Sequence, residues 1–388
     1  MATVTVLAVS DLENDPRVNR QLRFLHGRYR LVAGGLLPPK LPGVTFVPFP
    51  TKKKPKPIPY RFVAAARRLT GRYVTYYWNK MTIRDWYAGL RPHRADLIIS
   101  NDIMTLPLAV GLAEEFGAKV MYDAHEYAPR EFEDLWKWRL LEAPFVTALC
   151  KEYMPRVDAM TTVCQGIADE YERLTGVRAS LLTNAPDFND LNPRPCRDGD
   201  PVRLVHHGGA IPSRKLENMI DMMPHLDERF QLDFVLVGAN EGYRAKLERR
   251  AAKVGRVRFL PPVPMIDLPR FLNAYDLGVF LLEPTNFNYL HALPNKLFEF
   301  LQGRIGVAIG PSPEMARVVR ETGTGVVAPD FRPATLAGLL NRLTTADINQ
   351  FKARAHACAR EYSADRNRQT FLGLCEALCP PAPAARVA

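Results

Sequence analysis

The feature that most constrains the fold is an alternation of short apolar runs with amphipathic stretches. In the first half of the chain, "TVTVLAVSD", "ADLIISND" and "KVMYDAHE" are almost continuously apolar, and helical patterns such as "TLPLAVGLAEEFG" lie between such runs. Strands without a polar face are typical of parallel sheets covered on both sides. The predicted strands of this half are residues 3–11, 29–36, 44–50, 95–102, 119–126, 159–165 and 179–186.

The segment "PDFNDLNPRPCRDGDP" interrupts this alternation, and its richness in Pro, Asp and Asn predicts an interdomain linker. Beyond it we expect strands at residues 202–209, 231–239, 257–263, 277–283, 305–311 and 323–329. The chain has 388 residues, and single cores stop growing near ~250–300 residues. The sequence therefore predicts two doubly wound α/β domains. The expected divisions are residues 1–186, a linker at 187–201, a second domain at 202–345, and a C-terminal helical segment at 346–388.

Positive charge is concentrated in one segment of the first domain, residues 51–84, which contains no Asp or Glu. The segment contains ten cations. Subtracting them from the net charge of +11 leaves 11 − 10 = +1 for the rest of the chain. Aromatic residues, among them Trp78, are interleaved with them. A solvated surface, a nucleic-acid site and contact with anionic lipid all fit this mixture. The cations are Lys52, Lys53, Lys54, Lys56, Arg61, Arg67, Arg68, Arg72, Lys80 and Arg84.

Other sequence features indicate a cytoplasmic protein. The first residues, "MATVTVLAVSD", read as a strand, because no basic region precedes a long apolar stretch. No run approaches the ~18 apolar residues that a membrane-spanning helix needs. The six cysteines are scattered, without a C-x-x-C pair, so we expect reduced thiols and no metal site.

Polar residues follow several predicted strands of the first domain, where ligands of open α/β sheets bind. After the first strand, Asp15 is expected to cap a helix that begins at Pro16, with Arg17 exposed on that helix. The fifth strand ends in "YDAHEY", which brings together Asp123, His125 and Glu126. A histidine here either exchanges a proton with a substrate or serves only to hold the start of a helix.

The second domain has cations at two expected helix starts, where the helix dipole opposes positive charge. Arg214 and Lys215 follow the glycine turn of "VRLVHHGGAIPSRK", and Lys296 lies in the first turn of "LPNKLFEFLQ". A bound anion would compensate these cations, and Glu299, one turn beyond Lys296, would accept hydrogen bonds from hydroxyl groups. A surface Lys–Glu pair and an exposed arginine are the simpler interpretations.

Taken in order, these motifs resemble the GT-B glycosyltransferases, specifically the large family-four class that includes bacterial polysaccharide and glycolipid transferases. The resemblance covers residues 1–345 approximately, and the C-terminal helix also fits. It implies two Rossmann-like domains that face a cleft, with the last helix returning to the first domain. The motifs that carry it include "NDPRVNRQLRFL", "SNDIMTLPLAVGLA", "KVMYDAHEY", "DAMTTVCQGIADEY", "LLTNAPD", "HHGGAIPSRKLENMI" and "LPNKLFEFLQGRIGVAIGPSPEM".

The resemblance implies a role for several residues. Glu299 matches the glutamate that binds the donor ribose, Arg214 and Lys296 match the basic pair that holds the donor pyrophosphate, and His125 matches a histidine near the donor sugar. Eight residues before Glu299 the family often has a second glutamate, and this chain has His291 instead. The donor-binding residues so expected are Gly209, Arg214, Lys215, Val263, His291, Asn295, Lys296 and Glu299.

The expected reaction is sugar transfer from a UDP- or GDP-sugar to a lipid-linked or glycan acceptor, without a metal or other cofactor. Family habit favours retention of configuration; inversion would need a carboxylate base, for which Asp123, Glu126, Asp11 and Asp102 are candidates. The resemblance favours membrane contact for the basic segment, and hence a peripheral enzyme at the inner membrane face with no nucleic-acid partner. A GT-B sugar 2-epimerase, a two-domain binding protein and a basic nucleic-acid-binding protein are the alternatives.

Overall fold

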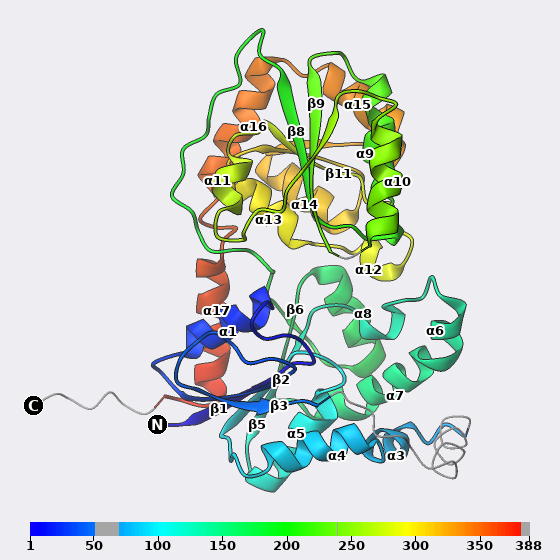
Figure 1. The fold of residues 1–388 in the computed structure, drawn as a ribbon. Helices are drawn as coiled ribbons and strands as arrows, with labels where there is room; N and C mark the ends of the chain where they lie inside the picture. Colours follow the sequence, from blue (N-terminus) through cyan, green and yellow to red (C-terminus); the bar gives the residue numbers. More distant parts are fainter. Residues whose placement is uncertain (51–69, 239, 382–388) are drawn as a thin grey trace, which may run out of the picture. The chain divides into compact units, whose positions relative to one another are not determined.

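The computed structural model describes residues 1–50, 70–238 and 240–381, and the chain forms two compact units (Figure 1). The first unit consists of Met1–Leu182 together with Arg368–Ala388, and the second unit is Thr183–Asn367. Each unit is built on its own parallel sheet, as the alternation of apolar runs predicts. The seven cations Lys52, Lys53, Lys54, Lys56, Arg61, Arg67 and Arg68 lie outside the described residues.

The first unit contains a seven-stranded sheet in the order β3-β2-β1-β4-β5-β6-β7, and each neighbouring pair is parallel. The strand order reverses direction between β1 and β4, which makes the carboxyl ends of these two strands the expected ligand position. All seven predicted strands are present. They are β1 (Thr3–Leu7), β2 (Arg30–Gly35), β3 (Val44–Pro48), β4 (Leu97–Ser100), β5 (Lys119–Ala124), β6 (Ala159–Thr162) and β7 (Ser180–Leu181).

Helices cover both faces of this sheet (Figure 1). Helix α5 ends at Gly117, the last residue of the helical pattern "TLPLAVGLAEEFG", whose φ of 72° is the left-handed conformation that glycine adopts most easily. The helices are α1 (Pro16–Leu25), α3 (Tyr73–Trp78), α4 (Met81–Leu90), α5 (Leu106–Phe116), α6 (Trp136–Leu141), α7 (Ala143–Tyr153), α8 (Gln165–Thr175) and the 3-10 turns η1 (Ala128–Arg130) and η2 (Met154–Arg156).

The last helix, α17 (Ala364–Leu378), completes the core of the first unit. Phe371 and Cys375 are fully buried among the apolar residues of β1 and α1. The Tyr29 hydroxyl donates a hydrogen bond to the Cys379 carbonyl at 2.8 Å, and Arg28 forms a 2.6 Å ion pair with Glu376. The C-terminal helix therefore belongs to the N-terminal core from Arg368 onward.

The second unit contains a six-stranded sheet in the order β10-β9-β8-β11-β12-β13, again parallel throughout. Its order reverses between β8 and β11, so the carboxyl ends of those strands mark the second expected ligand position. Each predicted strand is again present. They are β8 (Val202–Gly209), β9 (Phe230–Val237), β10 (Val257–Leu260), β11 (Leu277–Phe280), β12 (Gly306–Ile309) and β13 (Gly325–Val327).

The helices of the second unit pack over a core of buried residues from β8, β9, β11 and α9. Helix α13, which carries Lys296 and Glu299, begins after Pro294 as the sequence predicts. In chain order the elements are η3 (Pro212–Arg214), α9 (Glu217–Met222), η4 (Met223–His225), α10 (Glu241–Ala251), α11 (Leu268–Leu272), α12 (Phe287–Leu290), α13 (Asn295–Gln302), α14 (Pro313–Thr322), α15 (Pro333–Asn341) and α16 (Thr345–Cys358).

The segment expected to be a linker is instead fastened to the second unit. Arg304 is fully buried, and its guanidinium donates hydrogen bonds to the backbone carbonyls of Asn189 and Leu191. The backbone N–H of Cys196 donates to the Asn349 side chain at 2.8 Å. The unit boundary accordingly lies at residues 182–183, not 186–187, and α16 lies within the second unit.

Candidate functional site

A glycine turn ends strand β8 of the second unit. Gly208 has a φ of 119°, which disfavours any residue with a side chain. A Cβ at Gly208 would also lie 3.3 Å from Lys296 Nζ, and one at Gly209 would lie 3.6 Å from Arg214 Nη1. The turn thus brings bare backbone next to two cations, the arrangement that phosphate groups need.

Lys296 is a buried cation at the start of α13, with 5% of its surface exposed. Its Nζ lies 3.8 Å from the centre of the Phe280 ring, and it has no hydrogen-bond partner among the described residues. Burial, followed by the charge of Arg214, holds the pKa of Lys296 well below its usual range, and Glu299 only partly offsets this. A buried charge without a hydrogen bond is costly, so the site is incomplete without an anion.

The two other expected cations differ in their surroundings. Arg214, the last residue of η3, is half-buried beside Gly209. Lys215 adopts a φ of 48°, and its Nζ forms a 2.6 Å ion pair with Glu283 in the loop after β11. The geometry therefore groups Arg214 with Lys296, whereas Lys215 is already neutralised.

Glu299 lies one turn beyond Lys296 and is equally buried, with 5% of its surface exposed. One carboxylate oxygen is 3.4 Å from His207 Nε2. Burial, followed by the charge of Lys296, lowers the pKa of His207 to about 3, so this imidazole is neutral at physiological pH. A neutral imidazole brings no positive charge next to Glu299, and the carboxyl oxygens of Glu299 can accept hydrogen bonds from a ligand's hydroxyl groups.

His206 and His207, which precede the glycine turn, also belong to the site, although they were not predicted as site residues from the sequence. His206 is fully buried, and its Nδ1 lies 2.9 Å from the Val279 carbonyl. Burial, and next Lys296, hold the pKa of His206 well below its usual range. The signal was available in "VHHGG", because two polar residues replace the apolar ones expected at the end of a buried strand.

A carboxylate lies close to His291, although His291 itself replaces the glutamate that the family often has. Its Nδ1 lies 3.9 Å from an oxygen of Glu314, which is buried in the first turn of α14. A glutamate from another helix therefore lies next to the position where the family often has one. Sequence spacing alone could not pair these residues, because helix α13 and strand β12 separate them along the chain.

The remaining expected donor residues lie at strand and helix ends. Asn295 is the first residue of α13. Val263 is half-buried in the loop after β10, next to the exposed side chains of Met265 and Ile266. No described contact joins Val263 to Lys296, so its place among the donor-binding residues remains a prediction.

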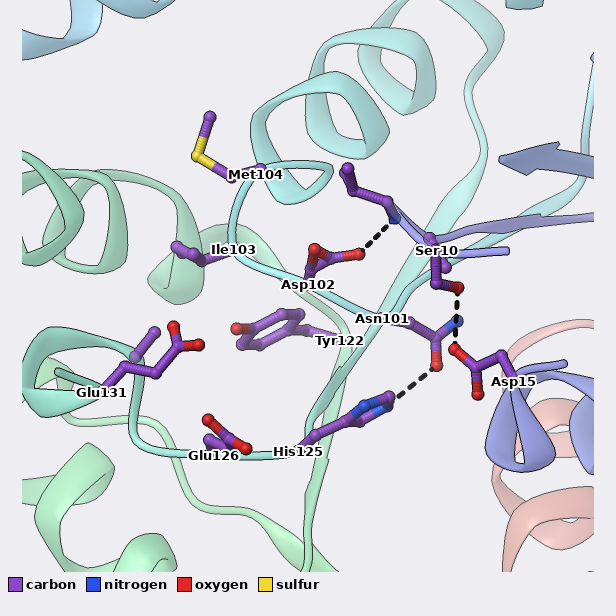
Figure 2. Close-up of a pocket in the computed structure, with 13 residues that line it drawn as sticks. Ser10, Asp15, Asn101, Asp102, Ile103, Met104, Tyr122, His125, Glu126 and Glu131 are labelled. Carbon is purple, nitrogen blue, oxygen red and sulfur yellow. Dashed lines mark hydrogen bonds between the residues drawn. The ribbon is translucent and has the colours of Figure 1, made fainter. Parts of the chain in front are cut away.

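The first unit has a pocket of about 300 Å³ at its own switch point (Figure 2). Residues that follow β1, β4 and β5 line it, as expected for the carboxyl edge of a parallel sheet. His125 and Glu126, both predicted from the sequence, are among them. The lining residues are Ala8, Val9, Ser10, Asp15, Asn101, Asp102, Ile103, Met104, Tyr122, His125, Glu126, Ala128 and Glu131.

Asp123, a predicted catalytic residue, does not line this pocket. It is fully buried and accepts hydrogen bonds from Arg17 Nε at 2.7 Å, Gln21 Nε2 at 2.7 Å and Thr161 Oγ1 at 2.6 Å. Burial would raise its pKa, but Arg17 and then His125 bring the pKa below its usual range. A permanently ionised carboxylate with three donors is a structural anchor and a poor base.

The same contacts correct the expectation for the first helix. Asp15 caps α1 as predicted, since its Oδ1 accepts from the N–H groups of Arg17 and Val18. Arg17, however, is buried with 5% of its surface exposed, because its side chain turns inward to Asp123. The sequence did not reveal this pairing, because 106 residues separate the two partners.

His125 is held at the pocket by a shared hydrogen-bond network. Its Nε2 lies 3.3 Å from Asn101 Oδ1, and Gln21 Nε2 donates to the same oxygen at 2.7 Å. Figure 2 shows the His125–Asn101 contact at the pocket's edge. The imidazole is one-third exposed, so its position suits contact with a bound molecule.

The pocket is rich in carboxylates, and one of them was not predicted. Burial, followed by the charges of Glu126 and Asp102, raises the pKa of Glu131 to about 7. Burial likewise raises the pKa of Asp102, although its carboxylate accepts a 2.6 Å hydrogen bond from the Val9 N–H. A carboxyl group that titrates near neutrality in a pocket is a candidate acid or base. Asp11, by contrast, bonds to Glu13 and Asn14 and is not part of the lining.

Of the basic segment that was expected to face a membrane, the described parts of the chain include Arg72, Trp78, Lys80 and Arg84. Arg72 is exposed immediately before α3. Trp78 is half-buried, and its Nε1 donates a 2.7 Å hydrogen bond to the Tyr153 hydroxyl. The indole is therefore engaged inside the first unit and is unsuited to anchoring in a membrane.

Neither a membrane-spanning helix nor a group of metal ligands is present among the described residues. No described helix has the length and apolarity needed to cross a bilayer. Within residues 1–50, 70–238 and 240–381, no three His, Cys, Asp or Glu side chains are grouped in a way that would hold a metal ion.

Comparison with known proteins identifies the fold. Residues 201–346 match the family described as glycosyl transferases group 1. No curated protein sequence matches the chain significantly. Among solved structures, HepE from Anabaena in complex with UDP-glucose aligns with a TM-score of 0.72 at 13% identity, covering 97% of this chain and 100% of HepE.

Two further solved structures cover nearly the whole chain. Sucrose-phosphate synthase from Thermosynechococcus elongatus has a TM-score of 0.75 at 11% identity, covering 97% of this chain and 99% of its own. WaaG, a glycosyltransferase involved in lipopolysaccharide biosynthesis, has a TM-score of 0.67 at 12% identity, with 97% and 99% coverage. The chain therefore has the GT-B fold, and its residues 201–346 are similar to the glycosyl transferases group 1.

Proposed function

We propose that this protein transfers a sugar from a UDP- or GDP-sugar to a lipid-linked or glycan acceptor. The observation that carries the proposal is Lys296, a buried cation whose Nζ has no hydrogen-bond partner in the described structure. It lies beside Gly208 and near Arg214, at the strand edge where open α/β sheets bind ligands. HepE, which has the same fold, has been solved in complex with UDP and with UDP-glucose, and this supports a nucleotide-sugar ligand.

The donor would bind by its charge and by its ribose. Lys296, Arg214 and the N-terminal turn of α13 would hold the two phosphates, and Glu299 would accept hydrogen bonds from the ribose hydroxyls. Because His207 is neutral beside Glu299, it leaves the negative charge of that carboxylate available to the ribose. Lys215 contributes less, since Glu283 already pairs with it.

In the reaction, the bond between the anomeric carbon and the diphosphate oxygen breaks as the acceptor hydroxyl oxygen bonds to that carbon. The electron pair of the broken bond leaves with the nucleoside diphosphate, where Lys296 and Arg214 stabilise its charge. This stabilisation requires no metal, so we expect transfer to continue in EDTA.

The acceptor proton has two possible destinations. With retention of configuration, which we favour, it passes to the departing phosphate, and His125 orients the sugar. With inversion it passes to a carboxylate of the pocket in the first unit, where Glu126, Asp102 and Glu131 are available and Asp123 is not. The anomeric configuration of the product, determined by NMR, distinguishes the two courses.

The test of the donor site is a calorimetric titration with UDP and GDP, followed by transfer assays with UDP- and GDP-sugars. Glu299→Ala should weaken the preferred nucleotide about tenfold or more, because hydrogen bonds to a charged group contribute about 1.5–3 kcal/mol. The matched control is Glu321→Ala, an exposed glutamate at the far end of α14. Unchanged nucleotide affinity in Glu299→Ala would refute the ribose assignment.

The specificity for the donor sugar is expected to involve His291 and Glu314. Glu314 offers the carboxylate that His291 lacks, and the two side chains lie 3.9 Å apart. Glu314→Gln should therefore raise the KM for the nucleotide-sugar while leaving the affinity for the free nucleotide unchanged. Equal losses for sugar donor and free nucleotide would instead indicate a structural role for Glu314.

A further inference from the structure

Exposed apolar side chains are concentrated around α6 in the first unit. Among the described residues, fourteen large hydrophobic side chains are exposed, and five of them fall within ten consecutive positions. Every residue of α6 is at least partly exposed. We call these five residues the α6 platform: Phe132 (45% exposed), Leu135 (54%), Trp136 (59%), Leu140 (67%) and Leu141 (48%).

The platform is a folded structure, so its exposure does not result from a loose segment. The rings of Phe132 and Trp138 make an edge contact with centroids 5.0 Å apart. Arg130 and Glu133 form an ion pair at 2.5 Å, and Arg139 Nη1 donates to the Glu133 carbonyl at 2.7 Å. A segment held in this way keeps its apolar side chains exposed until a partner covers them.

The charges around the platform suit an anionic partner. Within residues 132–141, Lys137 and Arg139 balance Glu133 and Asp134, and Glu133 is already paired with Arg130. Helix α6 packs on α7, which in turn packs on α3. Residues 70–84, which include α3, contain three cations, Arg72, Lys80 and Arg84, and no Asp or Glu.

Lys80 connects this basic stretch to α7. Its Nζ lies 4.4 Å from the centre of the Phe145 ring on α7 and 4.8 Å from that of Tyr76 on α3. Two exposed cations lie nearby in the same elements: Arg72 immediately precedes α3, and Lys151 is on α7. An apolar platform thus adjoins a surface with several cations, although α7 also carries Glu152.

We infer that the α6 platform docks on the surface of an anionic lipid bilayer. In the sequence "WKWRLL", each tryptophan is followed by a cation, and Lys137 Nζ lies 5.7 Å from the Trp136 ring. Tryptophan is favoured at headgroup depth, leucine below it, and Lys or Arg can extend its charge back to the lipid phosphates. This combination fits a bilayer better than a protein partner, since interface cores between proteins are depleted in lysine.

The platform adjoins the pocket of the first unit, so docking would serve the reaction. This step rests on the proposed function. Glu131 lines the pocket of the first unit, and Phe132, the next residue, is the first member of the platform. Docking would therefore bring the pocket to the membrane surface, where a lipid-linked acceptor presents its headgroup. The docking itself requires no donor and can be tested without one.

The experiment measures binding of the full chain to vesicles of phosphatidylglycerol mixed with phosphatidylcholine, with pure phosphatidylcholine for comparison. Leu140→Ser/Leu141→Ser should weaken binding to the mixed vesicles about tenfold or more, because apolar burial at the interface is lost. The control is Leu37→Ser, which removes a leucine of 50% exposure elsewhere on the first unit and should bind like the wild type.

Further measurements test whether the variants fold and whether docking is independent of donor binding. Both variants should keep the wild-type melting temperature and UDP affinity, which shows that they fold. In the wild type, brominated lipids should quench tryptophan fluorescence, and Trp136→Leu should remove most of that quenching. Lys296→Met should lose UDP binding and still bind vesicles, so failure of the donor site and failure of docking give different results.

Three outcomes would overturn the inference. The wild type fails to bind the mixed vesicles; the double variant binds them as well as the wild type; or Trp136 is not quenched. A change in the oligomeric mass of the double variant, with vesicle binding unaltered, would assign the platform to a second copy of the chain instead.

Discussion

Two buried cations, one in each unit, have the same exposure and opposite surroundings. Arg17 and Lys296 are each 5% exposed. Arg17 Nε donates to Asp123 at 2.7 Å, and a second nitrogen of the guanidinium bonds to the other carboxylate oxygen. Lys296 Nζ, by contrast, has no hydrogen-bond partner in the described structure and lies 3.8 Å from the centre of the Phe280 ring.

The difference separates a structural charge from a binding charge. A buried cation with a bidentate carboxylate contributes to folding, and removing either partner leaves the other uncompensated. A buried cation without such a partner raises the free energy of the empty protein, and only an incoming anion relieves this. Variants at the two positions should therefore act on stability in the first unit and on ligand affinity in the second.

The largest expected effect follows from removing the partner of Arg17. Asp123→Ala would leave a buried guanidinium without its carboxylate, and this typically costs about 3–5 kcal/mol of unfolding free energy. Urea denaturation monitored by circular dichroism measures the loss. Asp134→Ala, at an exposed position, should change stability by about 0.5 kcal/mol or less. A similar small change in Asp123→Ala would mean that the Arg17–Asp123 pair does not support the fold.

A smaller effect, dependent on pH, is expected at Glu131. Its pKa is raised to about 7 in the folded protein, whereas an unperturbed glutamate titrates near 4.3. Between these values the folded state holds a proton that the unfolded chain has released, so unfolding free energy falls as pH rises through this window. Glu131→Gln should remove that part of the decline, as denaturation at pH 5 and pH 8 would reveal. An unchanged decline would place the titrating group elsewhere.

The smallest expected effects distinguish the two cations that follow the glycine turn. Arg214→Met should weaken UDP binding about tenfold, because a charge-assisted hydrogen bond to phosphate is lost. Lys215→Met should weaken UDP binding by less, since Lys215 forms an ion pair with Glu283. Titration calorimetry compares the two variants directly. A larger loss in Lys215→Met than in Arg214→Met would reverse this assignment.

Much of the fold could be predicted from the sequence. Apolar runs such as residues 97–100 and 277–280 identify buried parallel strands by composition alone. Local signals also predicted the Asp15 cap and the Gly117 helix end. The attachment of segment 187–201 by Arg304 was not predictable, because it depends on contacts between residues more than a hundred positions apart.

The candidate site was likewise predictable only where local sequence signals define it. Lys296 and Glu299 stand out because they are charged within an otherwise apolar helix. Asp123 looked equally catalytic, and only the side chains of Arg17, Gln21 and Thr161 show that it is an anchor. Glu131 gave no sequence signal, since its raised pKa depends on burial and on two neighbouring carboxylates.

The most direct test is a UDP titration of the wild type and of Lys296→Met, combined with the unfolding free energy of both. Lys296→Met should bind UDP at least tenfold more weakly, because the cation that faces the phosphates is lost. Its unfolding free energy should equal or exceed that of the wild type, because a buried unpaired charge is removed. If Lys296→Met binds UDP like the wild type, or unfolds several kcal/mol more easily, then Lys296 is a structural residue and the proposed donor site is wrong.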